Sequence, residues 1–182
     1  AARDRANGAV MEMRFAEKRR GLAGLLTDPM AAGGIPLRVV HNDPKVNNVM
    51  VHRVTGEALC MLDLDTVKPG LVHFDFGDCV RSAANPAGED GDLDRVTFDL
   101  PLFRAVTCGY LSEASSFLTK REIEMLPASV KVITFELGLR FLADYLRGDT
   151  YFRTTHPSHN LLRARVQFKL LEHIESADLH SV

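Results

Sequence analysis

The first forty residues show helix-like spacing of apolar side chains followed by strand-like spacing. Between Ala9 and Leu26 apolar residues recur every three or four positions, which predicts an amphipathic helix. The side chains expected on its apolar face are Met11, Phe15, Leu22, Leu25 and Leu26. Gly33-Gly34 then predicts a turn, and Leu37–Val40 predicts a short strand.

A β-hairpin is predicted next. The segments Val49–Arg53 and Glu57–Leu62 are rich in β-prone residues, and Gly56 in the connection between them suits a positive φ. The second segment has the apolar pattern of a buried strand and leads directly into Asp63. The hairpin is therefore expected to deliver the Asp63 carboxylate to the loop that precedes it.

Helical spacing dominates the remainder of the chain. The predicted helices are Asp75–Ala84, Phe98–Ala114, Thr119–Met125, Pro127–Leu146 and about Ser158–Ile174. The helix that begins at Thr119 opens with a capping box. The Pro127–Leu146 helix is apolar on nearly every side, so it is expected at the buried centre. Its charged members Glu136 and Arg140 stand one turn apart, where they can pair. The pattern predicts a mainly helical α+β domain.

Composition restricts the partners and the compartment. The chain has 182 residues, 46% hydrophobic content and a formal charge of −2, with three cysteines at positions 60, 79 and 108. This charge supplies no basic field for nucleic acid or for an anionic membrane. The odd cysteine count and the lack of CxxC spacing argue against a disulfide framework, and no apolar run is long enough for a membrane helix. We expect a cytoplasmic protein.

The chemistry concentrates in the loop His41–Met50. It carries a carboxylate at Asp43, an ammonium at Lys45 and an amide oxygen at Asn48, and Asp63 follows 20 residues after Asp43. Phosphoryl transfer needs a carboxylate to accept the proton of a hydroxyl, a cation over the phosphoryl group, and oxygen ligands for Mg²⁺. The spacing H-x-D-x-K-x-x-N matches a kinase catalytic loop.

These residues resemble the aminoglycoside phosphotransferase and choline kinase family, which shares the protein-kinase-like fold. The likeness runs from about Ile35 to Phe152 and is densest between His41 and Arg81. Within the family, the string HNDPKVNNVM followed by TGEALCMLDLDTVKPG looks most like the N-acetylhexosamine kinases, which act on the anomeric hydroxyl of an amino sugar. The resemblance implies ATP as co-substrate, Mg²⁺ as cofactor and a small-molecule acceptor, a sugar.

A kinase of this type also needs a nucleotide-binding lobe with a glycine-rich strand-turn-strand and a strand lysine. Neither pattern occurs ahead of His41. We therefore expect residues 1–182 to form the C-terminal catalytic and substrate-binding lobe, with the N-terminal nucleotide lobe absent from this chain. The isolated chain is then expected to be inactive and to self-associate through apolar surface that the other lobe would cover.

Asp63 and Asp75 are the two candidates for the metal-binding aspartate. Asp75-Phe76-Gly77 is a literal D-F-G, the string that marks the metal-binding Asp in protein kinases. A single tight hairpin links the catalytic loop to the metal Asp, and the interval to Asp63 fits such a hairpin, whereas the path to Asp75 passes a Pro69-Gly70 turn. The resemblance implies that Asp75 opens a helix, as its N-cap, and accepts hydrogen bonds from the catalytic-loop backbone.

Each candidate also has a simpler interpretation. Asp43 alone would be a turn cap, Lys45 a solvated loop lysine, and Asn47 competes with Asn48 as metal ligand. His41 is expected to be a packed, hydrogen-bonded support rather than a proton carrier. Asp65, with Asp63, forms a D-x-D that also occurs in nucleotide-sugar transferases. The acidic loop Asn85–Asp94 lacks the spacing of a calcium site and is expected to be a solvated loop.

The candidate residues for binding the acceptor are Arg140 and Tyr151. A guanidinium in so apolar a helix is costly unless it faces a partner or a cavity. The sugar kinases that this sequence resembles place an Arg and an aromatic residue against the sugar, which implies Arg140 and Tyr151 here. A salt-bridged Arg and a surface Tyr would need no ligand. The alternative functions are a choline, homoserine or aminoglycoside kinase, and a non-catalytic metabolite-binding pseudokinase or truncated lobe.

Overall fold

The computed structural model describes residues 2–179, which form a mainly helical α+β structure, as the sequence predicts. The α-helices are α1 (Ala2–Gly8), α2 (Val10–Lys18), α3 (Thr27–Ala31), α4 (Val72–Ala83), α5 (Leu100–Ala114), α6 (Lys120–Arg147) and α7 (His159–Ser176). The strands are β1 (Arg38–Val40), β2 (Val49–Val51), β3 (Ala58–Met61) and β4 (Lys68–Gly70). Short 3-10 helices connect them: η1 (Arg20–Gly24), η2 (Val46–Asn48), η3 (Leu64–Thr66) and η4 (Leu93–Arg95).

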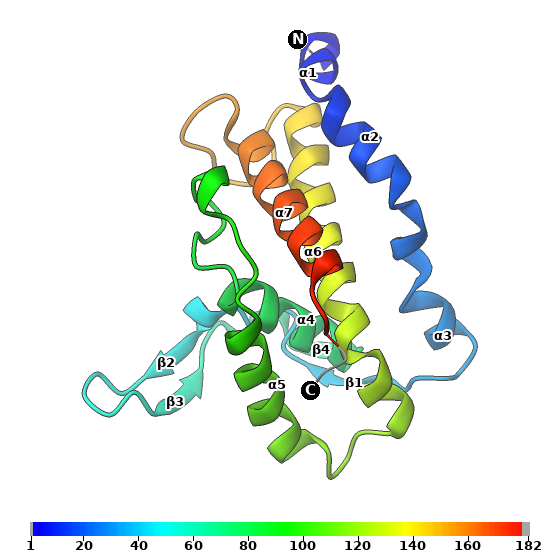
Figure 1. Cartoon of the computed structure of the whole chain (residues 1–182), viewed down its shortest axis with the longest axis vertical. Helices are drawn as coiled ribbons and strands as arrows, with labels where there is room; N and C mark the ends of the chain where they lie inside the picture. Colours follow the sequence, from blue (N-terminus) through cyan, green and yellow to red (C-terminus); the bar gives the residue numbers. More distant parts are fainter. Residues whose placement is uncertain (1, 180–182) are drawn as a thin grey trace.

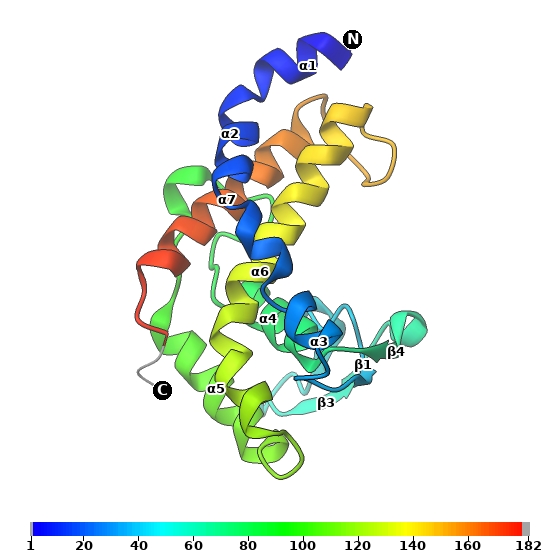
Figure 2. The ribbon, with the colours of Figure 1, turned by 90° about the vertical axis from the view of Figure 1, so that its right-hand side faces the viewer.

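Helix α6 runs through the centre of the helical part, with α7 beside it and α4 crossing it (Figures 1 and 2). Two glycines permit these close approaches. A Cβ atom at Gly77 of α4 would lie 2.8 Å from the carbonyl oxygen of Ser129, and one at Gly138 of α6 would lie 2.6 Å from the ring of Phe168. Because real Cβ atoms do not come so close to other atoms, the packing of α4 and α7 on α6 depends on glycine at both positions.

The core is built from the apolar faces of these helices. One cluster joins α4, α5, α6 and α7 through Phe76, Phe103, Val130 and Leu170, among others. A second joins α6 and α7 to α2, where Phe15 stacks on Phe168 with ring centroids 4.6 Å apart. Burying each such side chain contributes roughly 1.5–3 kcal/mol to stability. The end of α4 and the start of the loop that follows it are thereby fixed relative to α6 and α7.

The strands form two separate antiparallel pairs. β1 pairs with β4 in a register that places Val39 opposite Pro69, and β2 pairs with β3 in a hairpin that places Val49 opposite Met61. The hairpin extends away from the helices (Figure 1). Gly56 in its turn has a φ of 74°, as expected from the sequence.

The N-terminal helix prediction is wrong in its extent. The helix predicted to reach Leu26 breaks after Lys18 into η1 and then α3. Gly21 and Gly24 weaken helical continuity there. Met11 is 71% exposed instead of facing the core, and Glu12 takes a buried position by pairing with Arg165 at 2.6 Å.

The two helices predicted on either side of Pro127 form one helix, α6. The predicted capping box is present, since the Thr119 side chain accepts from the Glu122 N–H and the Glu122 side chain accepts from the Thr119 N–H. Pro127 removes one helical hydrogen bond, but Met125, Leu126 and Val130 on both sides of it are buried. Tertiary packing therefore carries the helix through the proline.

Two expectations around the loop His41–Met50 are also wrong. Helix α4 begins at Val72 with Leu71 as its N-cap residue, so Asp75 lies in the first turn and is not the N-cap. Strand β3 is exposed along its whole length, although its sequence has the pattern of a buried strand. Its two-stranded hairpin has no covering layer within residues 2–179, so an apolar run alone did not determine burial.

Within residues 2–179 no helix is both long enough and apolar enough to cross a membrane. Cys60, Cys79 and Cys108 are all free thiols.

Candidate functional site

The loop between β1 and η2 is clamped to helix α4 by Asp75. The Asp75 carboxylate accepts the backbone N–H of His41 at 2.7 Å and that of Asn42 at 2.8 Å. Burial raises the pKa of Asp75, and these two hydrogen bonds partly offset the effect. The backbone contacts expected for Asp75 are therefore present, and the carboxylate is occupied by the loop itself.

His41 ties the same loop to the end of the hairpin. Its ring Nε2 lies 2.8 Å from the carbonyl oxygen of Leu62, and its Nδ1 accepts the N–H of Asp43 at 3.3 Å. These two bonds imply the tautomer with the proton on Nε2. The Thr66 hydroxyl donates to the His41 carbonyl at 2.7 Å. His41 is buried with both ring nitrogens engaged, which is the geometry of a support for Asp43 and for the segment leading to Asp63.

Asp43, Lys45 and Asn48 meet at one point of the loop. The Lys45 ammonium lies 2.8 Å from Oδ2 of Asp43, and Asn48 Nδ2 donates to the same Oδ2 at 3.1 Å and to the Asp43 carbonyl at 2.8 Å. Partial burial opposes the charge of Lys45, but the hydrogen bond and charge of Asp43 outweigh it and raise the Lys45 pKa. The carboxylate is thus oriented by a cation and an amide.

Asp63 follows β3 in the left-handed conformation, with φ 63° and ψ 54°. Its strand end is fixed because the N–H of Leu62 donates to the Asn48 carbonyl at 2.8 Å. The hydrogen bond between the Asp63 and Asp65 carboxyl groups, followed by the negative charge of Asp65, raises the Asp63 pKa, because both favour a proton on Asp63. Negative charge is therefore concentrated at Asp63, where a cation would relieve it.

The residues present fit a magnesium ion that is shared with a nucleotide. Asn48 uses Nδ2 on Asp43, so its Oδ1 would be the ligand atom, and Asp63 would supply a carboxylate. In the described part of the chain, no cluster of three or more His, Cys, Asp or Glu side chains could hold a metal alone. Mg²⁺ characteristically takes one or two protein ligands together with phosphate oxygens and water, so two ligands suffice.

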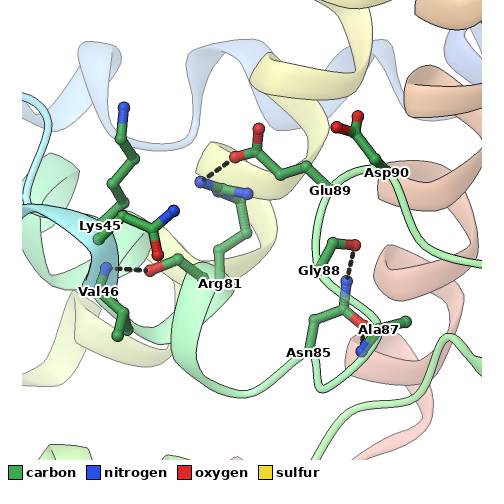
Figure 3. A pocket seen from close by; sticks show the side chains of 10 residues that line it. Lys45, Val46, Arg81, Asn85, Ala87, Gly88, Glu89 and Asp90 are labelled. Atoms are coloured by element: carbon green, nitrogen blue, oxygen red, sulfur yellow. Dashed lines mark hydrogen bonds and ion pairs between the residues drawn. The ribbon is translucent and has the colours of Figure 1, made fainter.

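A cavity of about 560 Å³ opens beside the loop. Figure 3 shows Lys45 on one side, Arg81 reaching from α4 toward Glu89, and Asp90 next to Glu89. Arg81 is 3% exposed and lies 2.8 Å from Asp78 and 3.0 Å from Glu89. The complete lining is Lys45, Val46, Asn47, Arg81, Ser82, Asn85, Ala87, Gly88, Glu89 and Asp90.

Residues 2–106 match the model of the Phosphotransferase enzyme family. The chain belongs to this family. The family is the aminoglycoside phosphotransferase and choline kinase family that the loop resembles, and the protein is therefore a phosphotransferase of the small-molecule type. The matched segment contains the loop, Asp63, Asp75 and the whole cavity lining, whereas Arg140 and Tyr151 lie beyond it.

The loop Asn85–Asp94 of this phosphotransferase is ion-paired where a solvated loop was expected. Asp90 contacts Arg163 of α7 at 2.5 Å and His159 at 3.0 Å, and Glu89 contacts Arg81. The hydrogen bond from Arg163 is the main cause that lowers the Asp90 pKa. The loop is thus fastened to α4 and α7 as a wall of the cavity.

Arg140 and Tyr151 come together on an exposed face of the phosphotransferase. The Arg140 guanidinium lies 5.7 Å from the Tyr151 ring centre and 3.7 Å from Glu136, as the predicted one-turn pair requires. Both charged side chains are about half exposed, whereas every other residue from Pro127 to Leu146 is buried or half-buried, as the apolar pattern of this helix predicts. Neither Arg140 nor Tyr151 lines the cavity.

The sequence interpretation missed Arg81, Glu89 and Asp90 as candidate binding residues. A signal for Arg81 exists, because it falls on the buried stripe of α4 that includes Phe76, Gly77 and Val80. A charge on such a stripe requires a partner. One partner, Asp78, lies three residues earlier on the same helix, but the other, Glu89, lies on an irregular loop whose path sequence periodicity does not predict.

Proposed function

We propose that this phosphotransferase moves the γ-phosphoryl group of ATP to a hydroxyl of a small neutral molecule, an N-acetylated amino sugar. The observation that carries the proposal is the convergence of Lys45 and Asn48 on one carboxylate oxygen of Asp43, at 2.8 and 3.1 Å. A base oriented by a cation, with a metal ligand in the same loop, suits in-line phosphoryl transfer.

Each residue then has one task. Asp43 orients the acceptor hydroxyl and takes its proton as the oxygen bonds to the γ-phosphorus and ADP departs. Lys45 offsets negative charge on the transferred group. Asn48 and Asp63 would hold Mg²⁺, which neutralises charge on the nucleotide phosphates. Asp75 and His41 keep the loop in this geometry through the backbone contacts described above.

The cavity supports a neutral hydroxylated acceptor. Its charged lining residues balance, with Lys45 and Arg81 against Glu89 and Asp90. Recognition of a quaternary ammonium favours an aromatic cage, and none of the lining residues is aromatic. A polycation would require unpaired acids, yet Glu89 and Asp90 are both paired with arginines. Arginine, asparagine and carboxylate groups together supply the donors and acceptors that sugar hydroxyls need.

A panel assay tests the acceptor class. The longest natural form of the protein is incubated with Mg²⁺-ATP and, separately, N-acetylglucosamine, N-acetylgalactosamine, glucose, choline, homoserine and kanamycin, and ADP release is followed. We expect the N-acetylated sugars to give the highest kcat/KM, with phosphate on the anomeric oxygen by ³¹P NMR. Preference for choline, homoserine or kanamycin would refute the sugar assignment. Sugar binding without ADP release would favour the non-catalytic alternative.

One variant and one control link the acceptor to the cavity. Glu89→Gln removes a lining carboxylate, and we expect it to raise the acceptor KM about tenfold while the KM for ATP stays unchanged. Asp94→Asn changes an exposed acid of the same loop that does not line the cavity, and it should leave both values unchanged. Equal effects of the two variants would show that the acceptor binds elsewhere.

A further inference from the structure

The cavity beside Asp43 has two cations in its wall, and both are paired with carboxylates. The ammonium of Lys45 lies 2.8 Å from the Asp43 carboxylate. The guanidinium of Arg81 lies 2.8 Å from Asp78 and 3.0 Å from Glu89. Among the described residues that line the cavity, no other is a lysine or an arginine. An acceptor with a carboxylate or phosphate group would therefore meet no unpaired cation on this wall.

Asp78 and Glu89 neutralise Arg81 from different sides. Asp78 lies three residues before Arg81 on α4, its side chain is 15% exposed, and it is not among the residues that line the cavity. The Glu89 side chain is 39% exposed and does line the cavity. Figure 3 shows its carboxylate at the end of the Arg81 side chain. Of the two acids, Glu89 is therefore the one that a molecule in the cavity would meet.

The backbone on both sides of Glu89 is held in place. The carbonyl oxygen of Gly88 accepts a hydrogen bond from the Asn85 side chain at 2.9 Å. On the other side, the Asp90 carboxylate accepts the Nε–H of Arg163 at 2.5 Å. A charge that is fixed before a ligand arrives does not need to reorganise around it. The Glu89 carboxylate is thus a preorganised negative group in the cavity wall.

The charge of Glu89 also acts on the cation beside Asp43. Burial opposes the charge of Lys45, but the hydrogen bond and charge of Asp43, followed by the charges of Glu89 and Asp78, outweigh it and raise the Lys45 pKa. Unit charges several ångströms apart near a protein surface change each other's binding constants by about tenfold or more. Glu89 is therefore close enough to the candidate base to influence an acceptor that reacts there.

We propose that Glu89 is a specificity-determining residue, which excludes acceptors with a carboxylate or phosphate group and restricts the cavity to neutral hydroxyl compounds. This inference rests on the proposed function, which places the acceptor in this cavity. Glu89 excludes anions in two ways, because it repels them directly and because it occupies Arg81, which would otherwise bind them. Glu89→Gln should therefore admit anions, and Arg81 keeps Asp78 as its partner in this variant.

Two sugars of nearly equal shape separate charge from size. N-acetylglucosaminuronic acid carries a carboxylate at C6, and its uronamide is the neutral isostere. With Mg²⁺-ATP and the longest natural form of the protein, wild type should prefer the uronamide by at least about tenfold in kcat/KM. Glu89→Gln should reduce this preference by at least about fivefold, and Glu89→Ala should do the same. Equal use of both sugars by wild type would overturn the proposal.

The matched control removes the same charge elsewhere on the loop. Asp94 is exposed and does not line the cavity, so Asp94→Asn should keep the wild-type preference for the uronamide. A loss of preference in Asp94→Asn equal to that in Glu89→Gln would show an effect of net charge alone and contradict the inference. An unchanged preference in both folded Glu89 variants would contradict it as well.

A titration without sugar or nucleotide keeps the test independent of the proposed function. Sulfate is added to ¹⁵N-labelled protein, and the amide shifts of Asn47 and Gly88 in the cavity lining are followed. We expect sulfate to bind Glu89→Gln at least about fivefold more tightly than wild type or Asp94→Asn. That result without ADP release on any acceptor would refute the proposed function but not the charge selectivity. Equal sulfate binding by all three proteins would overturn the inference even if sugars are phosphorylated.

Discussion

The backbone N–H of Asn42 donates to Oδ1 of Asp75 at 2.8 Å, across 33 residues of sequence. Asn42 has a φ of 67°, a left-handed conformation that residues other than glycine adopt infrequently. Local strain of this kind persists only where the surrounding structure holds it. The geometry of the loop immediately before Asp43 therefore depends on a carboxylate from α4.

Removing this carboxylate should destabilise the protein. Asp75→Ala leaves the N–H groups of His41 and Asn42 without an acceptor, which costs about 1–3 kcal/mol for each buried group. Urea unfolding should show a lower midpoint with an unchanged m-value. Asp94→Ala, on an exposed loop position, is the control and should have a wild-type midpoint. Equal stability of the two variants would contradict the clamp.

The magnesium assignment separates Asp63 from Asp75 and Asp65. Asparagine at position 63 tolerates the left-handed backbone as aspartate does, but it carries no charge. Asp63→Asn should therefore raise the Mg²⁺ concentration needed for half-maximal ADP release by at least about tenfold. Asp65→Asn should have a smaller effect. Equal effects at both positions would favour the D-x-D alternative, and a magnesium defect in Asp75→Asn but not in Asp63→Asn would refute the assignment.

Acid stability should depend on Glu122. Its fully buried carboxylate contacts Arg38 at 2.7 and 2.9 Å and accepts the Thr119 N–H, and the Arg38 hydrogen bond is the main cause that lowers its pKa from 4.5 to about 2. A lowered folded-state pKa favours the ionised form. Glu122 therefore contributes stability above pH 4.5, roughly 3 kcal/mol, which is lost as pH falls from 4.5 to about 2.

Urea midpoints across this pH window measure the effect. Glu122→Gln should be less stable than wild type at pH 6 and should lose less stability between pH 4.5 and pH 2. The control is Glu124→Gln on the same helix, whose acid is about half exposed and whose ion pairs contribute little. It should follow the wild-type curve. An unchanged slope in Glu122→Gln would show that another group carries the acid dependence.

The sequence predicted local features better than their surroundings. The Thr119 capping box, the Gly56 turn and the Glu136–Arg140 spacing all appear in the structure, because each depends on residues within one or two turns of chain. The hairpin between the loop His41–Met50 and Asp63 is also local. Its exposure was not predictable, since an apolar strand is buried only when another layer covers it.

Long-range packing explains the remaining differences. Pro127 stops an isolated helix, yet buried contacts on both sides carry α6 past it. Met11 is exposed and Glu12 is buried because Arg165, from α7, reaches Glu12. The cavity wall forms for the same reason, through the pairing of Asp90 with Arg163, 73 residues away. Hydrophobic periodicity along the sequence does not predict such distant partners.

The proposed function depends most on Asp43 as the base of a phosphoryl transfer. The decisive measurement is kcat for ADP release by Asp43→Asn, with Mg²⁺-ATP and the best acceptor of the panel at saturation. The variant keeps the size of the side chain, so its unfolding midpoint should be close to wild type and its acceptor Kd measurable. We predict that kcat falls by ~10²–10⁴. A folded Asp43→Asn protein that retains wild-type kcat would contradict the assignment of this loop as the catalytic centre.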